Sequence, residues 1–324
     1  MMIVANGPFR RIFWDALGAA IALVVIQTTA LAEAPSPTPS IATPSPYTLP
    51  WQLRSVMVGN VLRVDSAVAF YNDKAGNSGG TAAATMMTGT YKLAPNFAGL
   101  MRFGFVNNSP PTRAPGATSF INPVLGGTYA TELSNDFRLS VFLGATVPIG
   151  MGGGNTPDPS VQAANSAGIL ARSAMDNAMF APNYLTIIPG VDFAYIANGL
   201  TAQLEATFFQ LNRVRGENVD KDPERTNFTS GLGLGYAVTS QLSVATELRY
   251  QRWLNNQTVA ATANPATQNL SIGIGPRLNL KYGSTVIRPG IAYTNGLMGP
   301  MGSGGYTFPT NSDKIITVDI PVSF

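Results

Sequence analysis

The chain has 324 residues, of which 11% are charged, and its formal net charge is +3. It contains no cysteine and no histidine, which excludes disulfides, thiolate metal sites, a lipoprotein anchor, and the usual Ser-His-Asp and Cys-His forms of catalysis. So small a net charge indicates no nucleic-acid partner. We expect no metal, no cofactor and no enzymatic activity, and the acidic residues are interpreted as members of ion pairs rather than as a carboxylate-only hydrolase site.

The first residues have the features of a secretory signal peptide. Two arginines precede an apolar run, and Ala30-Leu31-Ala32 fits the small-x-small pattern of a signal peptidase site. We therefore expect residues 1–32 to be a signal peptide. The alternative is an uncleaved transmembrane anchor, because the stretch is nearly long enough to span a bilayer. Residues 33–50, rich in proline, serine and threonine, are expected to form an extended periplasmic tether.

Residues 51–324 contain no apolar run long enough for a spanning helix, although the chain is hydrophobic, and this combination is typical of membrane barrels. About twelve alternating or strand-like segments follow, each close to the length that a tilted strand needs to cross a bilayer. They lie at residues 60–71, 81–93, 97–107, 118–130, 136–147, 184–196, 200–212, 227–238, 241–253, 268–281, 285–294 and 314–324. The sequence thus predicts an all-β fold, a transmembrane antiparallel up-and-down β-barrel of about 12 strands.

The connections between these segments alternate between short and long. Tight-turn sequences lie at residues 94–96, 134–135, 197–199, 239–240 and 282–284. Longer connections lie at residues 72–80, 108–117, 148–183, 213–226, 254–267 and 295–313. Short periplasmic turns and long extracellular loops are typical of outer-membrane barrels, whereas a soluble β-sandwich has no reason to sort its connections in this way.

Side chains along the segments alternate between two faces. Leu200, Leu204 and Phe208 are predicted to face lipid, while Thr201 and Glu205 face the lumen. Aromatic residues gather near the segment ends, which predicts two interfacial girdles. They are Tyr91, Phe97, Phe105, Phe120, Tyr129, Phe137, Tyr195, Tyr236, Tyr250, Trp253, Tyr282, Tyr293 and Phe324.

The last segment has one apolar face, which includes Ile320, Val322 and the terminal Phe324. This ending resembles the carboxy-terminal strand of bacterial outer-membrane β-barrels, in which the final phenylalanine is part of the assembly signal. The resemblance implies recognition by the barrel-assembly machinery and a location in the outer membrane of a Gram-negative bacterium.

Four prolines interrupt the strand-like pattern, at Pro123, Pro189, Pro276 and Pro289. Proline cannot donate to a strand ladder, so we expect local bulges or kinks at these positions. Curvature of the barrel is the favoured interpretation, and lateral openings for an apolar substrate are the alternative.

A closer family resemblance lies in two segments and in the strands that begin with Pro-Gly. Asn122 to Tyr129 reads N-P-V-L-G-G-T-Y, and Tyr91 to Phe97 reads Y-K-L-A-P-N-F. With these features the chain resembles the outer-membrane channel family associated with meta-pathway phenol degradation, over roughly residues 50–324. The resemblance implies a barrel and makes uptake of small molecules an expectation, but it indicates no particular ligand.

Charged residues within the segments are predicted to face the lumen and to line a pore, because an Arg or Lys facing the bilayer midplane costs about 2–4 kcal/mol. By strand parity they are Arg63, Asp65, Arg102, Arg138, Asp192, Glu205, Glu247, Arg249, Arg277, Lys281, Arg288 and Asp319. In a water-filled lumen the arginines would act as selectivity residues with a mild preference for anions, and the acids as their counter-charges. In a tight lumen the same residues would pair into a plug, and a barrel of this size allows both outcomes.

The longest fully internal connection, residues 148–183, contains a predicted helix. Asp158 and Pro159 are suitable as its cap and first turn, and apolar residues continue as far as Met179. Our hypothesis is that this loop folds into or over the mouth and constricts the channel; an external lid without a role in transport is the alternative.

Together these features predict a channel for passive diffusion or uptake of small molecules, including hydrophobic or aromatic ones. The expected partners are outer-membrane lipid, the barrel-assembly machinery and small-molecule solutes. The alternative is a closed structural or surface-adhesion barrel whose long extracellular loops bind a partner.

Overall fold

The alternating segments form the strands of one antiparallel sheet in the computed structural model, which describes residues 47–72, 77–112, 114–255, 268–298 and 314–324. The predicted signal peptide lies outside the described residues, as does the predicted tether up to residue 46. Among the described residues, no helix is long and apolar enough to cross a membrane.

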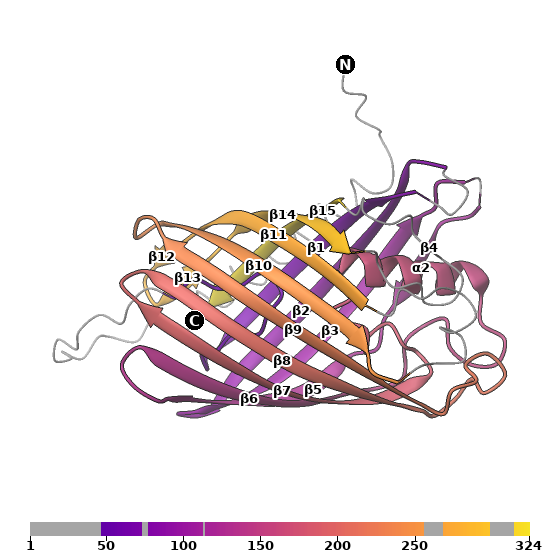
Figure 1. Cartoon of the computed structure of the whole chain (residues 1–324), viewed down its shortest axis with the longest axis horizontal. Helices are drawn as coiled ribbons and strands as arrows, with labels where there is room; N and C mark the ends of the chain where they lie inside the picture. The colour runs from indigo at the N-terminus through magenta and orange to yellow at the C-terminus, as the bar shows by residue number, and fades with distance from the viewer. Residues whose placement is uncertain (1–46, 73–76, 113, 256–267, 299–313) are drawn as a thin grey trace, which may run out of the picture. The chain divides into compact units, whose positions relative to one another are not determined.

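The sheet closes on itself, because the first strand pairs with the last as well as with the second (Figure 1). Its strands are β1 (Val61–Tyr71), β2 (Gly80–Ala94), β3 (Phe97–Ser109), β4 (Ala117–Phe120), β5 (Val124–Glu132), β6 (Phe137–Thr146), β7 (Tyr184–Ala197), β8 (Leu200–Arg213), β9 (Glu224–Ala237), β10 (Leu242–Trp253), β11 (Gln268–Leu278), β12 (Leu280–Tyr282), β13 (Thr285–Ile287), β14 (Gly290–Met298) and β15 (Lys314–Ser323). Within the described part of the chain there is one helix, α2 (Pro159–Ala171), which lies between β6 and β7.

These strands confirm the predicted barrel of twelve spans. Three spans are interrupted, so that β4 and β5 form the fourth, β11 and β12 the tenth, and β13 and β14 the eleventh. The predicted tight turns join neighbouring spans at one end of the barrel. Between β7 and β8, Asn198 and Gly199 both have positive φ, the backbone conformation that a two-residue hairpin with the twist of the flanking strands requires.

Pro123 lies where the fourth span is interrupted, and there the register shifts. Phe105 of β3 lies opposite Phe120 of β4, whereas Arg102 of β3 lies opposite Val124 of β5. The span thus uses one residue more than β3 over the same length, which is the definition of a bulge. The bulge expected at this proline is confirmed.

Bulges or kinks were expected at the other three prolines as well, and the register there is unchanged, so no bulge forms. Pro189 lies within β7 and Pro276 within β11, and the pairings on either side of each are in step. Pro289 separates β13 from β14, and both strands keep one register against β15. Proline removes one hydrogen-bond donor but adds no extra residue, so a strand can accommodate it without slipping.

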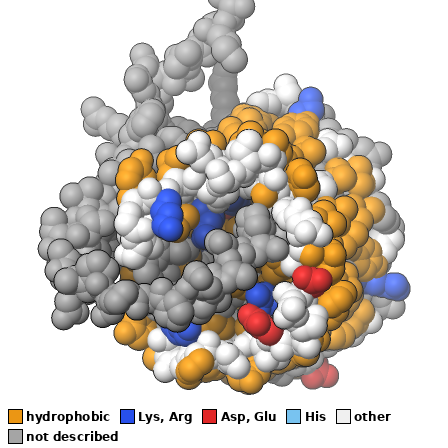
Figure 2. All heavy atoms as spheres, turned by 90° about the vertical axis from the view of Figure 1, so that its left-hand side faces the viewer, with side chains coloured by type: hydrophobic (Ala, Val, Ile, Leu, Met, Phe, Trp, Pro, Cys, Tyr) orange, Lys and Arg blue, Asp and Glu red, His pale blue; other side chains and the backbone are white. Residues whose placement is uncertain are grey.

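The outer wall of the barrel is apolar. Leu125, Leu143, Leu204 and Ile274 are each more than half exposed. Figure 2 views the end where β12 and β13 meet, and shows hydrophobic side chains over the outer wall with arginine and lysine side chains inside the rim. The predicted alternation of lipid-facing and lumen-facing residues is therefore confirmed in β8, whose odd-numbered residues from 201 to 209 are buried.

One member of the predicted aromatic girdles is placed wrongly. Trp253 is half-buried and packs against the hydrophobic cluster inside the barrel. It shares the parity of Arg249 and Gln251, which are buried in the lumen, so the strand pattern turns its ring inward. By contrast, Phe137 lies on the outer wall and stacks with Phe193 at 5.4 Å between ring centroids.

Candidate functional site in the barrel lumen

The charged residues predicted to line a pore lie on the lumen face of the wall. Eleven of the twelve have buried or half-buried side chains: Arg63, Asp65, Arg102, Arg138, Asp192, Glu205, Glu247, Arg249, Arg277, Arg288 and Asp319. Lys281 is exposed at the end of β12, next to the tight turn. The deep burial of the other eleven means that protein atoms occupy much of the lumen.

Several wall charges are paired with one another. Asp319, which is fully buried, accepts from Arg63 Nε at 2.9 Å and from Arg277 Nη2 at 2.6 Å. Arg249 Nε donates to Glu247 at 2.8 Å on the same strand.

Other predicted pore residues lie towards the turn end. Arg138 forms an ion pair with Glu132, whose side chain is largely exposed. Arg288 is half-buried and donates to the Ser323 hydroxyl at 3.0 Å. These groups lie near the mouth rather than at the centre of the lumen.

The chain before β1 enters the barrel. Residues 47–58, which we call the plug, lie against the lumen faces of β7, β8, β9 and β10, in the half of the barrel that carries the tight turns. The Tyr47 hydroxyl donates to Gln203 Oε1 at 2.9 Å, and the Thr48 backbone N–H donates to the Thr201 hydroxyl at 3.0 Å. The last four residues of the predicted tether, 47–50, therefore belong to the packed lumen.

Trp51 anchors the middle of the plug and is completely buried. Its backbone N–H donates to Glu247 Oε2 at 2.5 Å, and its indole N–H donates to the Ala245 carbonyl at 3.1 Å. The guanidinium of Arg277 lies 4.3 Å from the ring centroid, a cation–π contact. Arg63 Nη2 donates to the Pro50 carbonyl at 3.2 Å. Wall charges thus hold both the backbone and the ring of this segment.

Arg54 carries the positive charge of the plug. Its guanidinium lies 3.3 Å from both Asp192 Oδ2 and Glu205 Oε1, and it donates to the Thr207 hydroxyl at 2.7 Å. It also lies 4.9 Å from the centroid of the Phe142 ring. Asp192 and Glu205 have almost no exposure, so Arg54 is the counter-charge that allows two neighbouring carboxylates to be buried together.

Glycines of the wall leave the space that the plug occupies. A Cβ added to Gly231 would lie 2.2 Å from Leu53, one added to Gly235 would lie 2.5 Å from Thr48, and one added to Gly290 would lie 2.7 Å from the Trp51 ring. These distances are shorter than side-chain packing permits. The lumen face of β9 thus lacks side chains where the plug lies.

The long connection between β6 and β7, residues 147–183, enters the lumen from the other end; we call it the inserted loop. It contains α2, whose start at Asp158 and Pro159 was predicted: the Asp158 carboxylate accepts from the Ser160 backbone N–H at 2.8 Å. The helix ends at Ala171, and residues 173 and 174 adopt positive φ. Met175 and Met179 therefore lie beyond the helix, in a series of turns.

An ionic network fixes the tip of the inserted loop to the wall. Arg172 forms an ion pair with Asp65 of β1, and its Nε donates to Asp176 at 2.8 Å. Arg102 of β3 binds the same carboxylate through two contacts, of 2.6 and 3.1 Å. Burial alone would raise the pKa of Asp176, but Arg102 and Arg172 outweigh it and lower the pKa to about 2. Asp176 is therefore ionised at neutral pH.

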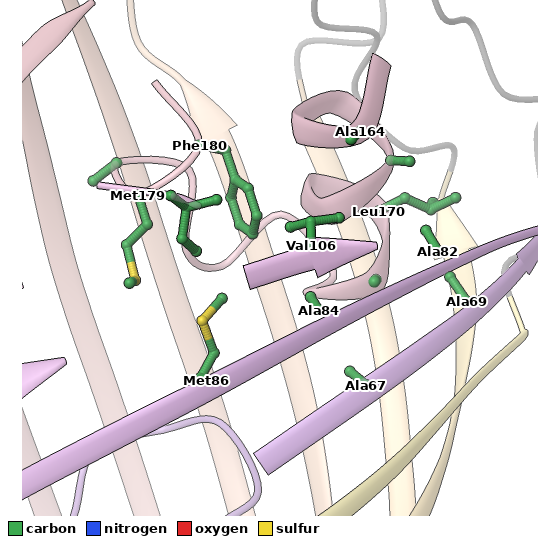
Figure 3. Close-up of a cluster of buried hydrophobic side chains, with 14 of the residues drawn as sticks. Ala67, Ala69, Ala82, Ala84, Met86, Val106, Ala164, Leu170, Met179 and Phe180 are labelled. Atoms are coloured by element: carbon green, nitrogen blue, oxygen red, sulfur yellow. The ribbon is translucent and has the colours of Figure 1, made fainter. Parts of the chain in front are cut away.

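Apolar packing supports this network. The helix α2 lies against β1, β2 and β3, where small wall residues such as Ala69 and Ala82 admit Leu170 of the helix (Figure 3). Phe180 and Val106 meet close to Gly168, at which an added Cβ would lie 2.6 Å from each of them. The inserted loop is thus packed into the barrel rather than placed over its mouth.

Between the plug and the inserted loop there is a small cavity. Its volume is about 80 Å3, and its lining comes from the plug, the loop and the wall. Both ion-paired arginines that face the gap, Arg54 and Arg102, contribute to the lining. At this cavity the two inserted segments approach each other without filling the space.

Several residues that pack or pair inside the lumen were missed from the sequence. Trp51, Gln52 and Arg54 lie in a stretch without a strand or helix period, and Arg172 and Asp176 follow the end of the predicted helix. One available signal was the run Gly231-Leu-Gly-Leu-Gly235, which leaves one face of β9 without side chains. A wall of this kind requires another segment to fill the space beside it.

No family model and no curated protein matches the chain. Among solved structures, an outer-membrane channel from Pseudomonas putida F1 matches with a TM-score of 0.53 and 12% identity, over 86% of this chain and 100% of that one. This protein has the fold of an outer-membrane channel barrel. The NanC porin (TM-score 0.48, 11% identity, 81% and 98% coverage) and the KdgM porin (0.42, 9%, 81% and 99%) are more distant. At these identities the likeness concerns the fold of the barrel and extends to no ligand.

Proposed function

We propose that this protein is an outer-membrane channel for small molecules, and that the described conformation is its closed state. The solutes include apolar and aromatic molecules, and passage is passive. The apolar outer wall supports a position in a bilayer, and the exported, outer-membrane location follows the predicted signal peptide and assembly signal.

One observation carries this proposal: the lumen is filled by segments that do not belong to the wall. Small barrels that are permanently closed fill their interior with wall side chains. Here the lumen face of β9 is glycine where the plug lies, and the plug and the inserted loop supply the filling. Withdrawal of the plug would leave a channel lined by Glu205, Glu247 and Arg277 rather than a collapsed core.

The lumen charges support a polar path with a mild preference for anions. Of the eleven predicted residues that are buried or half-buried, six are basic and five are acidic, and Asp319 is shared by two arginines. Once the plug leaves, Arg277 and Arg63 lose their contacts with it and face water. Exposed guanidinium groups in a narrow pore attract anions.

The competing proposal is a closed structural or surface-adhesion barrel with partner-binding loops. The number of ion pairs inside the lumen favours it, because such networks rigidify a core when every member is satisfied. We expect no enzymatic activity in either case.

Planar-bilayer recordings test the proposal. The variant lacking residues 47–58 is expected to give large, long-lived conductance steps, while the full protein gives rare openings. Heat-modifiable migration in gels confirms that each variant is folded. A folded plug-deletion variant that inserts but carries no current, and that passes no solute in liposome swelling, would establish the closed structural barrel.

A further inference from the structure

A row of four side chains crosses the outer wall of β8, β9, β10 and β11, which lie side by side (Figure 1). The strand register places Phe208 opposite Phe228, Phe228 opposite Arg252, and Arg252 opposite Gln268. All four strands turn their even-numbered residues outward at this level. The row, which we call the outer row, lies near the end of β10 that leads into the long connection at residues 254–267.

Four positions nearer the middle of the wall, the same strands carry only aliphatic side chains on the outside. This aliphatic row is between 37% and 55% exposed and consists of Leu204, Leu232, Leu248 and Ile272. The two rows are about 13 Å apart along the strands, since a strand rises about 3.3 Å per residue. An outward arginine costs about 2–4 kcal/mol at the bilayer midplane but at most about 1 kcal/mol near the interface. The outer row therefore marks the level at which hydrocarbon ends and lipid headgroups begin.

Arg252 brings an uncompensated positive charge to this level. Its side chain is exposed, and within the described part of the chain its guanidinium forms no ion pair and donates no hydrogen bond. The contact that Arg252 makes is through its backbone carbonyl, which accepts from Asn227 at 3.1 Å. Glu224 lies on the same face of β9, but it is four residues beyond Phe228, about 13 Å further along the strand. The guanidinium is thus available to an anionic group outside the protein.

The neighbours of Arg252 in the outer row suit a molecule with a polar head and apolar chains. On one side, the Tyr250 hydroxyl donates to Gln268 Oε1 at 3.1 Å, which leaves the amide N–H groups of Gln268 as further donors. On the other side, the rings of Phe208 and Phe228 pack with their centroids 5.0 Å apart. Interfacial aromatic rings lie between the hydrocarbon and the headgroup layer. Donors and apolar surface therefore meet at Arg252.

A phosphate ester is the anionic head that fits this arrangement. The guanidinium presents paired N–H donors whose planar geometry matches the oxygens of a phosphate. The aliphatic row lies below, where the acyl chains attached to such a head would run. A soluble anion would use the donors alone, whereas a lipid uses both rows.

We propose that the outer row and the aliphatic row form a docking site for a phosphate-bearing lipid in the leaflet on the side of the long loops. Arg252 and Gln268 bind the phosphate, and the aliphatic row contacts the acyl chains. The site is independent of the proposed channel function, because it lies on the outer wall and requires neither an open lumen nor any movement of the plug.

Native mass spectrometry of the full mature protein, released from non-ionic detergent micelles, tests the site by counting bound lipid molecules. The probes are dilauroyl phosphatidic acid and dilauroylglycerol, which have the same chains and differ only in the phosphate. Phosphatidic acid is expected to bind more tightly than dilauroylglycerol. Arg252→Gln should weaken the tightest binding of phosphatidic acid about fivefold, the effect of one basic side chain at an anionic lipid surface, and should leave dilauroylglycerol binding unchanged.

A variant at the opposite end of the barrel is the matched control. Lys92 is an exposed basic residue close to the tight turn after β2, and Lys92→Gln is expected to leave the tightest phosphatidic acid site unaffected. Glycerol 3-phosphate, which is the head without the chains, should not displace the lipid at equal concentration.

Three results would overturn the proposal: equal affinity of the original protein and Arg252→Gln for phosphatidic acid, an equal loss in Lys92→Gln, or displacement by glycerol 3-phosphate at equal concentration. Heat-modifiable migration in gels verifies that each variant is folded. A barrel that binds the lipid but never conducts would refute only the channel proposal, and a conducting barrel without this binding would refute only the docking site.

Discussion

Replacing Arg54 by leucine is expected to release the plug. The guanidinium is the counter-charge of two buried carboxylates, Asp192 and Glu205, each 3.3 Å away. Removing one partner of a buried ion pair costs about 3–5 kcal/mol when the other stays buried. If the plug leaves, water reaches both carboxylates and this cost disappears. The substitution therefore shifts the balance towards the open state by at least about 3 kcal/mol, which corresponds to roughly a hundredfold.

Single-channel recording measures this shift as the open probability at fixed voltage. Arg138→Leu is the matched control, because it removes a lumen arginine whose ion-pair partner, Glu132, lies on the wall. Arg54→Leu should raise the open probability by about two orders of magnitude, while Arg138→Leu should alter only ion selectivity. Folded Arg54→Leu channels with the open probability of the original protein would show that Arg54 does not hold the plug.

Four further predictions concern the plug, the inserted loop and the outer wall. Gly235→Val should create a clash with Thr48 and weaken the binding of the plug to the wall by about 1–3 kcal/mol, which is measured as a higher open probability. Adding Thr48→Gly to this variant should restore closure, and a double variant that stays open would contradict the prediction. The pKa of Asp176 is lowered to about 2 in the folded protein, whereas an aspartate in an unfolded chain has a pKa of about 3.9. The ionised carboxylate therefore stabilises the loop fully at pH values above about 3.9, and this stabilisation is lost as the pH falls through about 2. Open probability should be flat from pH 7 to about 4 and then rise, whereas Asp176→Asn should lack this step. Leu204→Arg should reduce the free energy of folding into lipid vesicles by about 2–4 kcal/mol, measured by denaturant titration. Deleting residues 157–178 should raise conductance, and unchanged conductance and selectivity would remove the constriction hypothesis.

The wall was predictable because its pattern is local. A strand exposed to lipid on one side and to the lumen on the other alternates residue by residue, so the faces of β8 and the inward direction of Glu205 and Arg249 followed from parity. The start of α2 was predictable for a similar reason, because Asp158 and Pro159 are capping residues adjacent in sequence.

The filling of the lumen was not predictable because its contacts are remote in sequence. Trp51 binds Glu247, almost 200 positions away, and Arg54 binds residues of β7 and β8. The plug has no repeating spacing of apolar residues, so no period distinguishes it from the proline-rich stretch before it. Strand parity predicts that an arginine faces the lumen. Whether that arginine then contacts water or protein depends on the plug, whose sequence has no period from which its position could be predicted.

The nature of the plug contacts bears on whether the lumen can open. A segment held by apolar packing loses its hydrophobic stabilisation when it moves into water. The plug buries the apolar side chains of Leu49, Trp51, Leu53 and Val56, but it is also held by charged and hydrogen-bonding groups: Glu247 on the backbone, Arg277 over the Trp51 ring, and Arg54 between two carboxylates. Each of these groups was desolvated when the plug was seated, and each regains hydration in a water-filled lumen, which offsets much of the lost attraction. The lumen charges can therefore both hold the plug in the closed state and select solutes in the open state. The residues that form pairs in the closed state are those that an open channel would present to a permeating solute.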